Sequence, residues 1–269
     1  MARPLPKSLL VDLVQRKRLL LCLDYDGTIA ATTSNPDDAK PIEGARNAIR
    51  TLSRHREDVV LAIVSGRDAL TTRRLLGIFD GLYFVGLHGL EILDPDDRRE
   101  ILVPVNHCIP ALHTVRDWLK KEARESDGFM VEDKELSIAL HYRNANLELA
   151  RDICRQLEYF VGHMIRGLRV THGDMVEEVI PSNTGGKGFA INHLLAQLKD
   201  KTLLPIYFGN DSSDEEAFFA VRRVGGATIL VGEERDTHAE FHADEPAQAI
   251  EVLASLADAL ELPVANAAT

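Results

Sequence analysis

The feature that most constrains this chain is a series of short apolar runs, each followed by turn residues. The runs cover residues 19–23, 59–64, 82–85, 206–208 and 228–231. Between the first two runs, Ala45, Ile49 and Leu52 recur at helical spacing, and residues 250–260 repeat such a stripe. Short buried strands that alternate with amphipathic helices are typical of β-α units on a parallel sheet. The sequence therefore predicts an α/β fold with a doubly wound parallel-sheet core.

A middle segment departs from this alternation. It predicts helices around residues 112–119 and 147–161 and strands at residues 129–131, 137–142, 168–171 and 175–180. The last two strands are separated by His172, Gly173 and Asp174, a tight-turn signal for an antiparallel hairpin. We therefore expect an α/β core from residues 1–104 and 182–269. Residues 105–181 are expected to form an α+β domain inserted into this core.

Charge and hydropathy exclude several classes of partner. The 269 residues carry 31 Lys and Arg against 42 Asp and Glu, a formal net charge of −11, which disfavours binding to nucleic acid or to anionic lipid. The longest uninterrupted apolar run has six residues, whereas a membrane helix needs about 20. We expect a small-molecule partner, with no nucleic acid and no membrane.

The cysteines and the N-terminal residues bear on the compartment. Cys22, Cys108 and Cys154 lie in apolar settings without metal-ligand spacing, which favours buried thiols in a reducing environment. Charged and polar residues interrupt the apolar residues near the N-terminus, so a signal peptide is not expected. These patterns predict a cytoplasmic protein, and we expect a monomer.

The first strand ends in two carboxylates. Asp24 and Asp26 stand two residues apart, followed by Gly27 and Thr28, where a parallel sheet opens its ligand crevice. Two neighbouring carboxylates repel each other unless a cation lies between them, and hard oxygen ligands suit Mg²⁺. A calcium loop would need another Asp or Asn before the glycine and a preceding helix, and the sequence has neither. An Asx-type turn after the strand remains the alternative.

Two further segments offer groups that suit a phosphoryl oxygen. Ser65, Gly66 and Arg67 end the second strand and supply a hydroxyl, a flexible backbone amide and a cation. Lys187 lies among glycines in the segment 184–188, which opens a helix. This segment is not a P-loop, because the first glycine and the hydroxyl residue of that motif are absent. Taken singly, each segment also fits an ordinary turn or a surface lysine.

A second acidic cluster follows the fourth strand, in Gly209, Asn210, Asp211, Asp214 and Glu215. The last two could simply be helix N-terminal charges, a role that is worth about 0.3 to 1 kcal/mol. Polar clusters at four successive strand ends, however, favour one shared site.

The order of these motifs resembles the four motifs of the haloacid dehalogenase superfamily of phosphohydrolases. More narrowly, several segments resemble trehalose-6-phosphate phosphatases, and the similarity runs from about residue 19 to residue 253. The segments are G-L-H-G-L-E at 86–91, V-E-D-K at 131–134, H-Y-R at 141–143, M-V-E-E-V-I-P at 175–181 and residues 209–218. The resemblance implies a Mg²⁺-dependent phosphatase that hydrolyses trehalose 6-phosphate through an aspartyl phosphate. It also implies that the core is catalytic and that the inserted domain, residues 105–181, is a cap that closes over the core and sets substrate specificity.

The resemblance also implies roles for individual residues. Asp24 would be the nucleophile and Asp26 the general acid and base, while Ser65 and Lys187 would hold the phosphoryl oxygens. The implied metal ligands are Asp24, Asp26, Asn210, Asp211 and Asp214. The implied substrate-binding residues are Gly66, Arg67, His88, Glu91, Glu132, Lys134, His141, Arg143 and Glu178.

One position departs from the family pattern, since Asn210 stands where the family usually has aspartate. Either Asn210 binds the ion as a neutral ligand, or Asp211 and Asp214 supply the missing charge directly or through water. Other functions also remain open: a phosphatase for another sugar phosphate of the sucrose or glucosylglycerol type, a sugar phosphomutase, or a non-catalytic sugar-phosphate sensor. The sensor is disfavoured because it would not need Asp26.

Overall fold

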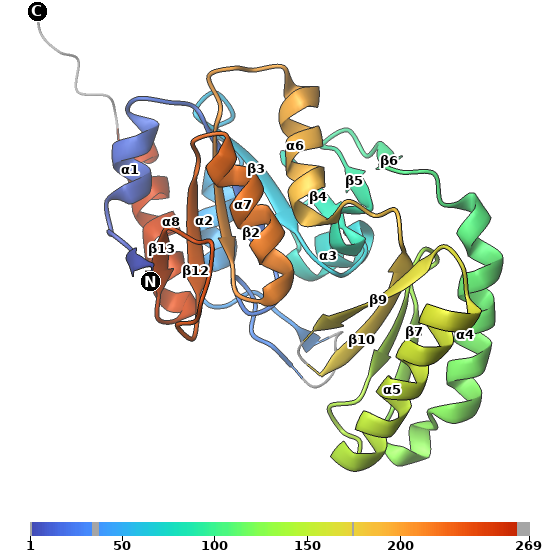
Figure 1. The fold of residues 1–269 in the computed structure, drawn as a ribbon. Helices are drawn as coiled ribbons and strands as arrows, with labels where there is room; N and C mark the ends of the chain where they lie inside the picture. Colours follow the sequence, from blue (N-terminus) through green and yellow to red (C-terminus); the bar gives the residue numbers. More distant parts are fainter. Residues whose placement is uncertain (1, 34–37, 174, 263–269) are drawn as a thin grey trace, which may run out of the picture. The chain divides into compact units, whose positions relative to one another are not determined.

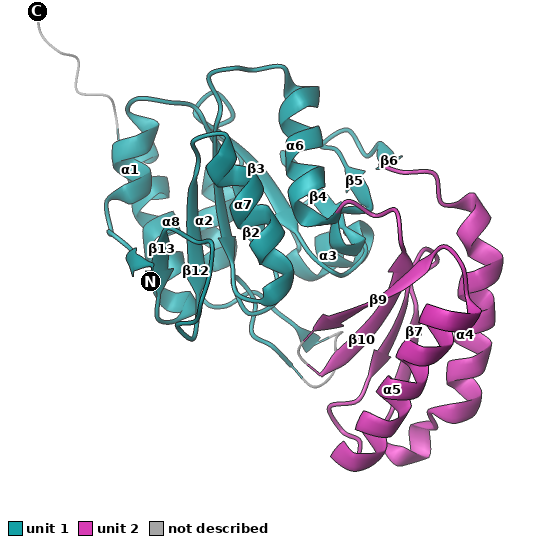
Figure 2. Cartoon of the chain, viewed as in Figure 1, with its two compact units in different colours: residues 1–100, 186–269 teal, residues 101–185 magenta. Residues whose placement is uncertain are grey.

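The protein divides into two compact units, shown in different colours in Figure 2. The structure is a computed structural model that describes residues 2–33, 38–173 and 175–262. Unit 1 comprises residues 1–100 and 186–269, and unit 2 comprises residues 101–185. The chain therefore leaves the first unit, builds the second, and returns to complete the first.

Among the described residues, unit 1 is built on a nine-stranded sheet in the order β1-β13-β12-β11-β2-β3-β4-β5-β6. In this order, each pair of neighbouring strands from β1 through β13, β12, β11, β2 and β3 to β4 is parallel, and β5 is antiparallel to β4. The strands are β1 (Arg3–Pro4), β2 (Leu19–Asp24), β3 (Val59–Val64), β4 (Leu82–Gly86), β5 (Glu91–Leu93), β6 (Arg99–Ile101), β11 (Leu204–Gly209), β12 (Ala227–Val231) and β13 (Phe241–Ala243).

Helices cover both faces of this sheet (Figure 1). One face packs against α1 (Leu9–Val14), α2 (Ala45–Leu52), α3 (Ala69–Leu76) and α8 (Pro246–Glu261). The other face is covered by α6 (Gly186–Leu198) and α7 (Glu215–Arg223). Successive strand residues alternate between the faces, so Leu21 and Leu23 belong to the first core and Cys22 points the opposite way. The predicted doubly wound α/β core is confirmed.

In its described residues, unit 2 contains a four-stranded antiparallel sheet in the order β7-β8-β10-β9 and two α-helices. Its elements are α4 (Ile109–Glu122), β7 (Met130–Asp133), β8 (Ile138–His141), α5 (Leu147–Met164), β9 (Leu168–Gly173) and β10 (Val176–Pro181). Apolar residues of both helices and of one sheet face share a core. The predicted hairpin is confirmed as β9 and β10, while the turn residue Asp174 lies outside the described residues.

Local signals explain where several helices begin. Asp68 precedes α3, and its side chain accepts a hydrogen bond from Thr71 N at 2.8 Å. Asn146 precedes α5 and accepts from the backbone N–H groups of its first turn. Such caps satisfy amide groups that have no partner inside the helix. Pro246 begins α8, where the missing N–H costs nothing.

Short 3₁₀ turns connect the elements: Leu87–Gly89, Asn106–Cys108, Glu125–Asp127 and Ser212–Asp214. Cys22 and Cys108 are buried and Cys154 is partly exposed, so the expectation of burial holds for two of the three cysteines. In the described part of the chain, every helix is too short or too polar to cross a membrane.

Candidate active site

At the centre of the sheet of unit 1, Lys187 lies between two buried carboxylates. Its Nζ donates to Asp24 Oδ1 at 2.8 Å and to Asp214 Oδ1 at 2.7 Å. Asp24 ends β2, Lys187 lies in the first turn of α6, and Asp214 ends the 3₁₀ turn after β11. All three side chains are at least 94% buried. Three segments far apart in the sequence therefore place one ammonium and two carboxylates at a single point.

Close helix packing brings Lys187 to this position. A Cβ on Gly188 would lie 2.5 Å from the backbone oxygen of Glu216, so only glycine lets α6 approach α7 so closely. Gly186 has a φ of +74°, a left-handed conformation that suits glycine. The glycines that flank Lys187 thus serve backbone geometry.

The charges of this group are strongly coupled. Burial alone would lower the pKa of Lys187, but the carboxylates of Asp214, Asp24 and Asp211 outweigh it and raise this pKa well above its ordinary value. Lys187 is therefore an ammonium at neutral pH. Burial raises the pKa of Asp24 well above its ordinary value, with Lys187 opposing the shift and the other two carboxylates adding to it.

The structure does not support the metal-ligand role that the resemblance implied for Asp214. Its Oδ1 accepts from Lys187 and from the Tyr207 hydroxyl, the latter at 2.6 Å. Its Oδ2 accepts from the backbone N–H groups of Asn210 and Asp211 at 2.9 and 3.0 Å. Asp214 has no exposed surface. Since both oxygens are already engaged, Asp214 is the counter-ion of Lys187 and is not placed to bind a cation directly.

The remaining oxygen donors do fit a divalent cation. Asp24 Oδ2 is buried and has no hydrogen-bond partner among the described protein atoms. Asn210 and Asp211 follow β11 at the same sheet edge, and a Cβ on Gly27 would lie 2.0 Å from Asn210 Nδ2. The Asn210 side chain therefore lies against the loop that carries Asp24. A buried carboxylate oxygen without a donor, beside an amide and a second carboxylate, suits Mg²⁺.

Asp26 forms an ion pair with Arg67. Arg67 Nε donates to Asp26 Oδ2 and Nη2 donates to Oδ1, both at 2.7 Å. Ser65, which is 1% exposed, follows the register partner of Asp24 on β3, and its Oγ accepts from Arg67 N at 3.1 Å. The two predicted segments thus meet at one edge of the sheet, as their positions after parallel strands require.

His88 also belongs to this edge. Its φ of +53° is in the left-handed region, and a Cβ on Gly66 would lie 2.7 Å from two of its ring atoms. The imidazole therefore rests against the loop of Ser65, and this contact requires glycine at position 66. Its backbone N–H donates to Ser65 O at 3.1 Å, which fastens the two loops together.

Glu91 is the second residue that the structure places differently from the sequence prediction. It was expected to bind substrate, but it is 1% exposed. Its Oε1 accepts from Ala69 N at 2.7 Å and its Oε2 accepts from Arg99 Nε at 2.5 Å. The carboxylate joins the start of α3 to β5 and β6, a structural task that leaves it inaccessible to a ligand.

The other predicted substrate residues lie in unit 2, and Glu132, Lys134, His141 and Glu178 share the face of its sheet opposite the helices. Lys134 Nζ donates to Glu178 Oε2 at 3.0 Å, and Ser137 Oγ donates to Glu178 Oε1 at 2.5 Å. The neighbouring Glu177 points the other way and pairs with His172. Lys134 and Glu178 side chains are 6% and 5% exposed, so this is a buried ion pair.

A second pair lies beside it, His141 Nε2 and Glu132 Oε2 at 2.8 Å. Burial opposes ionisation of Glu132, but the hydrogen bond with His141 and the charge of Lys134 outweigh burial and lower its pKa. Arg143 is partly exposed, two residues after His141. This face thus offers charged donors and acceptors of the kind that bind hydroxyl groups.

Two residues that contact Asp211 or Asp214 escaped the sequence analysis. Tyr207 lies inside β11, and in the sequence a tyrosine in an apolar strand cannot be told from any other aromatic residue of the core. Arg235 lies in the loop after β12, and its Nη2 donates to Asp211 O at 2.7 Å. The sequence holds no local signal for Arg235, because its target is 24 residues away.

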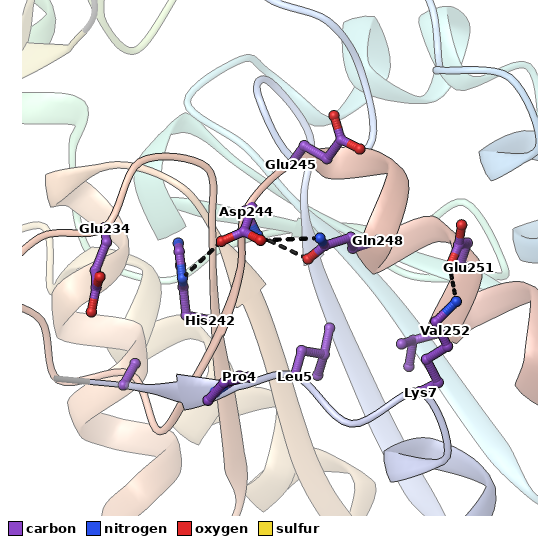
Figure 3. Close-up of a pocket in the computed structure, with 11 residues that line it drawn as sticks. Pro4, Leu5, Lys7, Glu234, His242, Asp244, Glu245, Gln248, Glu251 and Val252 are labelled. Atoms are coloured by element: carbon purple, nitrogen blue, oxygen red, sulfur yellow. Dashed lines mark hydrogen bonds and ion pairs between the residues drawn. The ribbon is translucent and has the colours of Figure 1, made fainter.

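A surface pocket of about 570 Å³ lies elsewhere in unit 1, beside β1, β13 and the start of α8 (Figure 3). Its lining includes the carboxylates of Glu234, Asp244, Glu245 and Glu251, with Lys7 at 2.9 Å from the last. None of the predicted site residues is among the described residues that line it. The pocket is therefore separate from the candidate active site.

Comparison with known proteins agrees with this arrangement. The family model described as trehalose-phosphatase matches residues 22–247. The chain belongs to the trehalose-phosphatase family. The predicted family resemblance is therefore confirmed.

Curated members of the trehalose-phosphatase family are longer than the part they share with this chain. The trehalose-phosphate phosphatase of Mycolicibacterium paratuberculosis is 34% identical over 247 residues, which cover 88% of this chain and 62% of that protein. That of Mycobacterium leprae is 32% identical over 263 residues, which cover 92% and 59%. The chain thus spans about three fifths of the length of these relatives.

Solved structures show the same fold. The C-terminal domain of a Candida albicans trehalose-6-phosphate phosphatase has a TM-score of 0.84 at 22% identity, covering 96% of this chain and 98% of that one. A haloacid dehalogenase-like hydrolase from B. subtilis has a TM-score of 0.60 at 15% identity, covering 88% and 99%. The predicted haloacid dehalogenase-like fold is confirmed.

Proposed function

We propose that this chain is a Mg²⁺-dependent phosphatase that hydrolyses trehalose 6-phosphate to trehalose and inorganic phosphate. Membership of the trehalose-phosphatase family supports the substrate. The observation that carries the chemistry is the placement of Lys187 between Asp24 and Asp214, with Asp24 Oδ2 buried and unpaired. The unpaired oxygen can bind the ion, the Asp24 carboxylate can attack phosphorus, and the adjacent ammonium can take up the charge of a phosphoryl oxygen.

In this mechanism the Asp24 carboxylate attacks phosphorus and the bond to the sugar oxygen breaks, which leaves an aspartyl phosphate. Asp26 gives a proton to the departing sugar oxygen and then takes one from the attacking water. Water attacks the aspartyl phosphate, the acyl phosphate bond to Asp24 breaks, and inorganic phosphate departs. Lys187 and Ser65 hold the equatorial phosphoryl oxygens.

Asp24, Asn210 and Asp211 are the residues that would hold Mg²⁺. The ion would screen the repulsion between the Asp24 carboxylate and the phosphoryl group. Asp214 sets the position of Lys187 and contributes no direct ligand. The charged face of unit 2, with Lys134, Glu178 and their neighbours, would bind the sugar hydroxyls.

The test is phosphate release from trehalose 6-phosphate with Mg²⁺ and without any bisphosphate activator, beside a panel of other sugar phosphates. We expect the highest kcat/KM on trehalose 6-phosphate. If the enzyme prefers another sugar phosphate, that compound would take the place of trehalose 6-phosphate as the assigned substrate. A requirement for bisphosphate would favour a mutase.

The Asp24→Asn variant tests the nucleophile, because an amide cannot form the acyl phosphate. We expect a folded variant with no turnover. Activity above a tenth of the wild-type rate would remove Asp24 from this role.

A further inference from the structure

A buried hydroxyl donates to the same carboxylate oxygen as Lys187. Tyr207 is in the middle of β11, in register with Cys22 on β2, and has no exposed surface. Its ring lies edge-on to Phe218 of α7, with centroids 5.6 Å apart. Its hydroxyl donates to Asp214 Oδ1 at 2.6 Å. A phenylalanine would fill almost the same space without a buried polar atom, so the hydroxyl group requires a reason of its own.

Asp214 Oδ1 is shared between two donors. It accepts from Tyr207 on one side and from Lys187 on the other, while Oδ2 is fixed by two backbone N–H groups. The carboxylate therefore cannot rotate without losing a hydrogen bond in a site that excludes water. The hydroxyl also takes up part of the charge on Oδ1, which weakens the attraction of Asp214 for the ammonium.

We propose that Tyr207 is a positioning residue for phosphoryl transfer: its hydroxyl fixes Asp214 so that Lys187 is directed to Asp24 and the phosphoryl group. This inference rests on the proposed phosphatase function. Lys187 has three N–H donors, and two of them reach Asp24 and Asp214. The third is available to a phosphoryl oxygen.

The effect of the hydroxyl falls mainly on the transition state. Without it, Asp214 Oδ1 keeps one donor, and Lys187 is drawn toward Asp214 and away from the transferring group. Negative charge on the phosphoryl oxygens must be stabilised most strongly during transfer, so a displaced ammonium lowers kcat more than it raises KM. Since Tyr207 acts at the phosphoryl end, the loss is independent of the leaving group.

The experiment compares Tyr207→Phe with Leu256→Val, a core change on α8, which packs on the opposite sheet face. We expect Tyr207→Phe to lower kcat about tenfold on both trehalose 6-phosphate and p-nitrophenyl phosphate, with KM changed less than about threefold. Binding of orthovanadate, measured by calorimetry, should weaken by a similar factor. Leu256→Val should lower Tm and leave kcat and vanadate binding unchanged below its transition.

A double variant separates positioning from simple loss of packing. If Tyr207 acts through Asp214, adding Tyr207→Phe to Asp214→Asn changes kcat and vanadate affinity less than about twofold. Independent losses in the double variant would overturn the inference, as would wild-type kcat and vanadate affinity in Tyr207→Phe alone.

Failure of the proposed function gives a different result. A wild-type protein that releases no phosphate from either substrate would refute the phosphatase. The vanadate measurement would then still decide whether the Tyr207 hydroxyl sets the affinity of the Lys187 site for a phosphate-like anion.

Discussion

Arg67 holds both carboxylate oxygens of Asp26, with its Nε 2.7 Å from Oδ2 and its Nη2 2.7 Å from Oδ1. A two-point contact of this kind fixes the plane of the carboxylate as well as its position. Asp26 is one third exposed, so the carboxylate is accessible to a ligand as well as to Arg67. The pair therefore holds the Asp26 carboxylate in one orientation in the loop after β2.

Replacing Asp26 with Asn should remove this acid and leave the nucleophile in place. We expect a loss of about 10² to 10⁴ in kcat on trehalose 6-phosphate, because a sugar alkoxide needs a proton to depart. The loss on p-nitrophenyl phosphate should be much smaller, since nitrophenolate is a good leaving group. Steady-state kinetics on both substrates provide the measurement, and equal losses would argue against the acid role.

The Asn210→Asp variant tests the proposed metal site. Asn210 lies against Gly27 beside the unpaired oxygen of Asp24, so a carboxylate there adds negative charge close to the ion. We expect the variant to bind Mg²⁺ at least as tightly as the wild type, measured by calorimetry and by reactivation after EDTA treatment. Distinctly weaker binding would mean that the amide serves another purpose, such as a hydrogen bond from Nδ2.

The sequence predicted the core strands well because their apolar runs have a physical cause. A strand of a parallel sheet is covered on both faces, so β2 and β3 carry continuous apolar residues that no loop would hold. The ends of those strands necessarily meet at one edge, which is why the positions of Asp24, Ser65 and Asp211 in the sequence were enough to group them. The two- and three-residue strands β1, β5, β6 and β13 are too short to carry a period.

The parts of the site that the sequence missed depend on contacts between distant segments. In the sequence Tyr207 looks like any aromatic residue of the core, and only the folded structure shows that its hydroxyl donates to Asp214. Glu91 was expected to bind substrate because it lies in a family motif. Its burial and its hydrogen bonds with Ala69 and Arg99 are visible only in the folded structure. Asp214 was expected to bind metal because acidic residues cluster there, and its four donors exclude that role.

Glu215 should make stability depend on acid pH. It accepts hydrogen bonds from His238 N at 2.7 Å, from Thr237 at 2.8 Å and from Arg235. Burial opposes its ionisation, but these donors outweigh burial and lower its pKa below the ordinary value of 4.5. When a carboxyl group has a lower pKa in the folded protein than in the unfolded chain, its full contribution to stability is present at pH values above the unfolded pKa. This contribution is lost as pH falls through the folded pKa.

The measurement compares the free energy of unfolding of wild type and Glu215→Gln between pH 3 and 7, with Glu43→Gln as an exposed control. We expect the wild type to be more stable at pH 6 to 7 and its advantage to shrink below about pH 4.5. The control should match the wild type throughout. A wild-type advantage that stays constant down to pH 3 would contradict the assignment.

The last prediction concerns two neighbouring glutamates on β10 that face opposite sides of the sheet of unit 2. Glu178 pairs with Lys134 on the face away from the helices, whereas Glu177 pairs with His172 on the helix side. Truncating Glu178 to Ala would take a carboxylate partner from the buried Lys134 ammonium, and breaking a buried ion pair in this way costs up to about 3 to 5 kcal/mol in stability. Glu178→Gln keeps the shape and one acceptor oxygen, which can still receive Lys134, while its amide nitrogen can donate to the Ser137 hydroxyl, so it removes the charge with little change in packing.

If Glu178 binds a sugar hydroxyl, Glu178→Gln should lower kcat/KM on trehalose 6-phosphate by roughly 10- to 150-fold, the loss of one hydrogen bond to a charged group. Turnover of p-nitrophenyl phosphate, which has no sugar, should be unchanged. Glu177→Gln is the matched control and should leave both substrates unaffected, because its carboxylate points toward α5. Equal effects of the two variants, or equal losses on both substrates, would show that Glu178 only maintains the sheet, and sugar recognition would then have to be assigned to other residues of this face, such as Glu132 and Arg143.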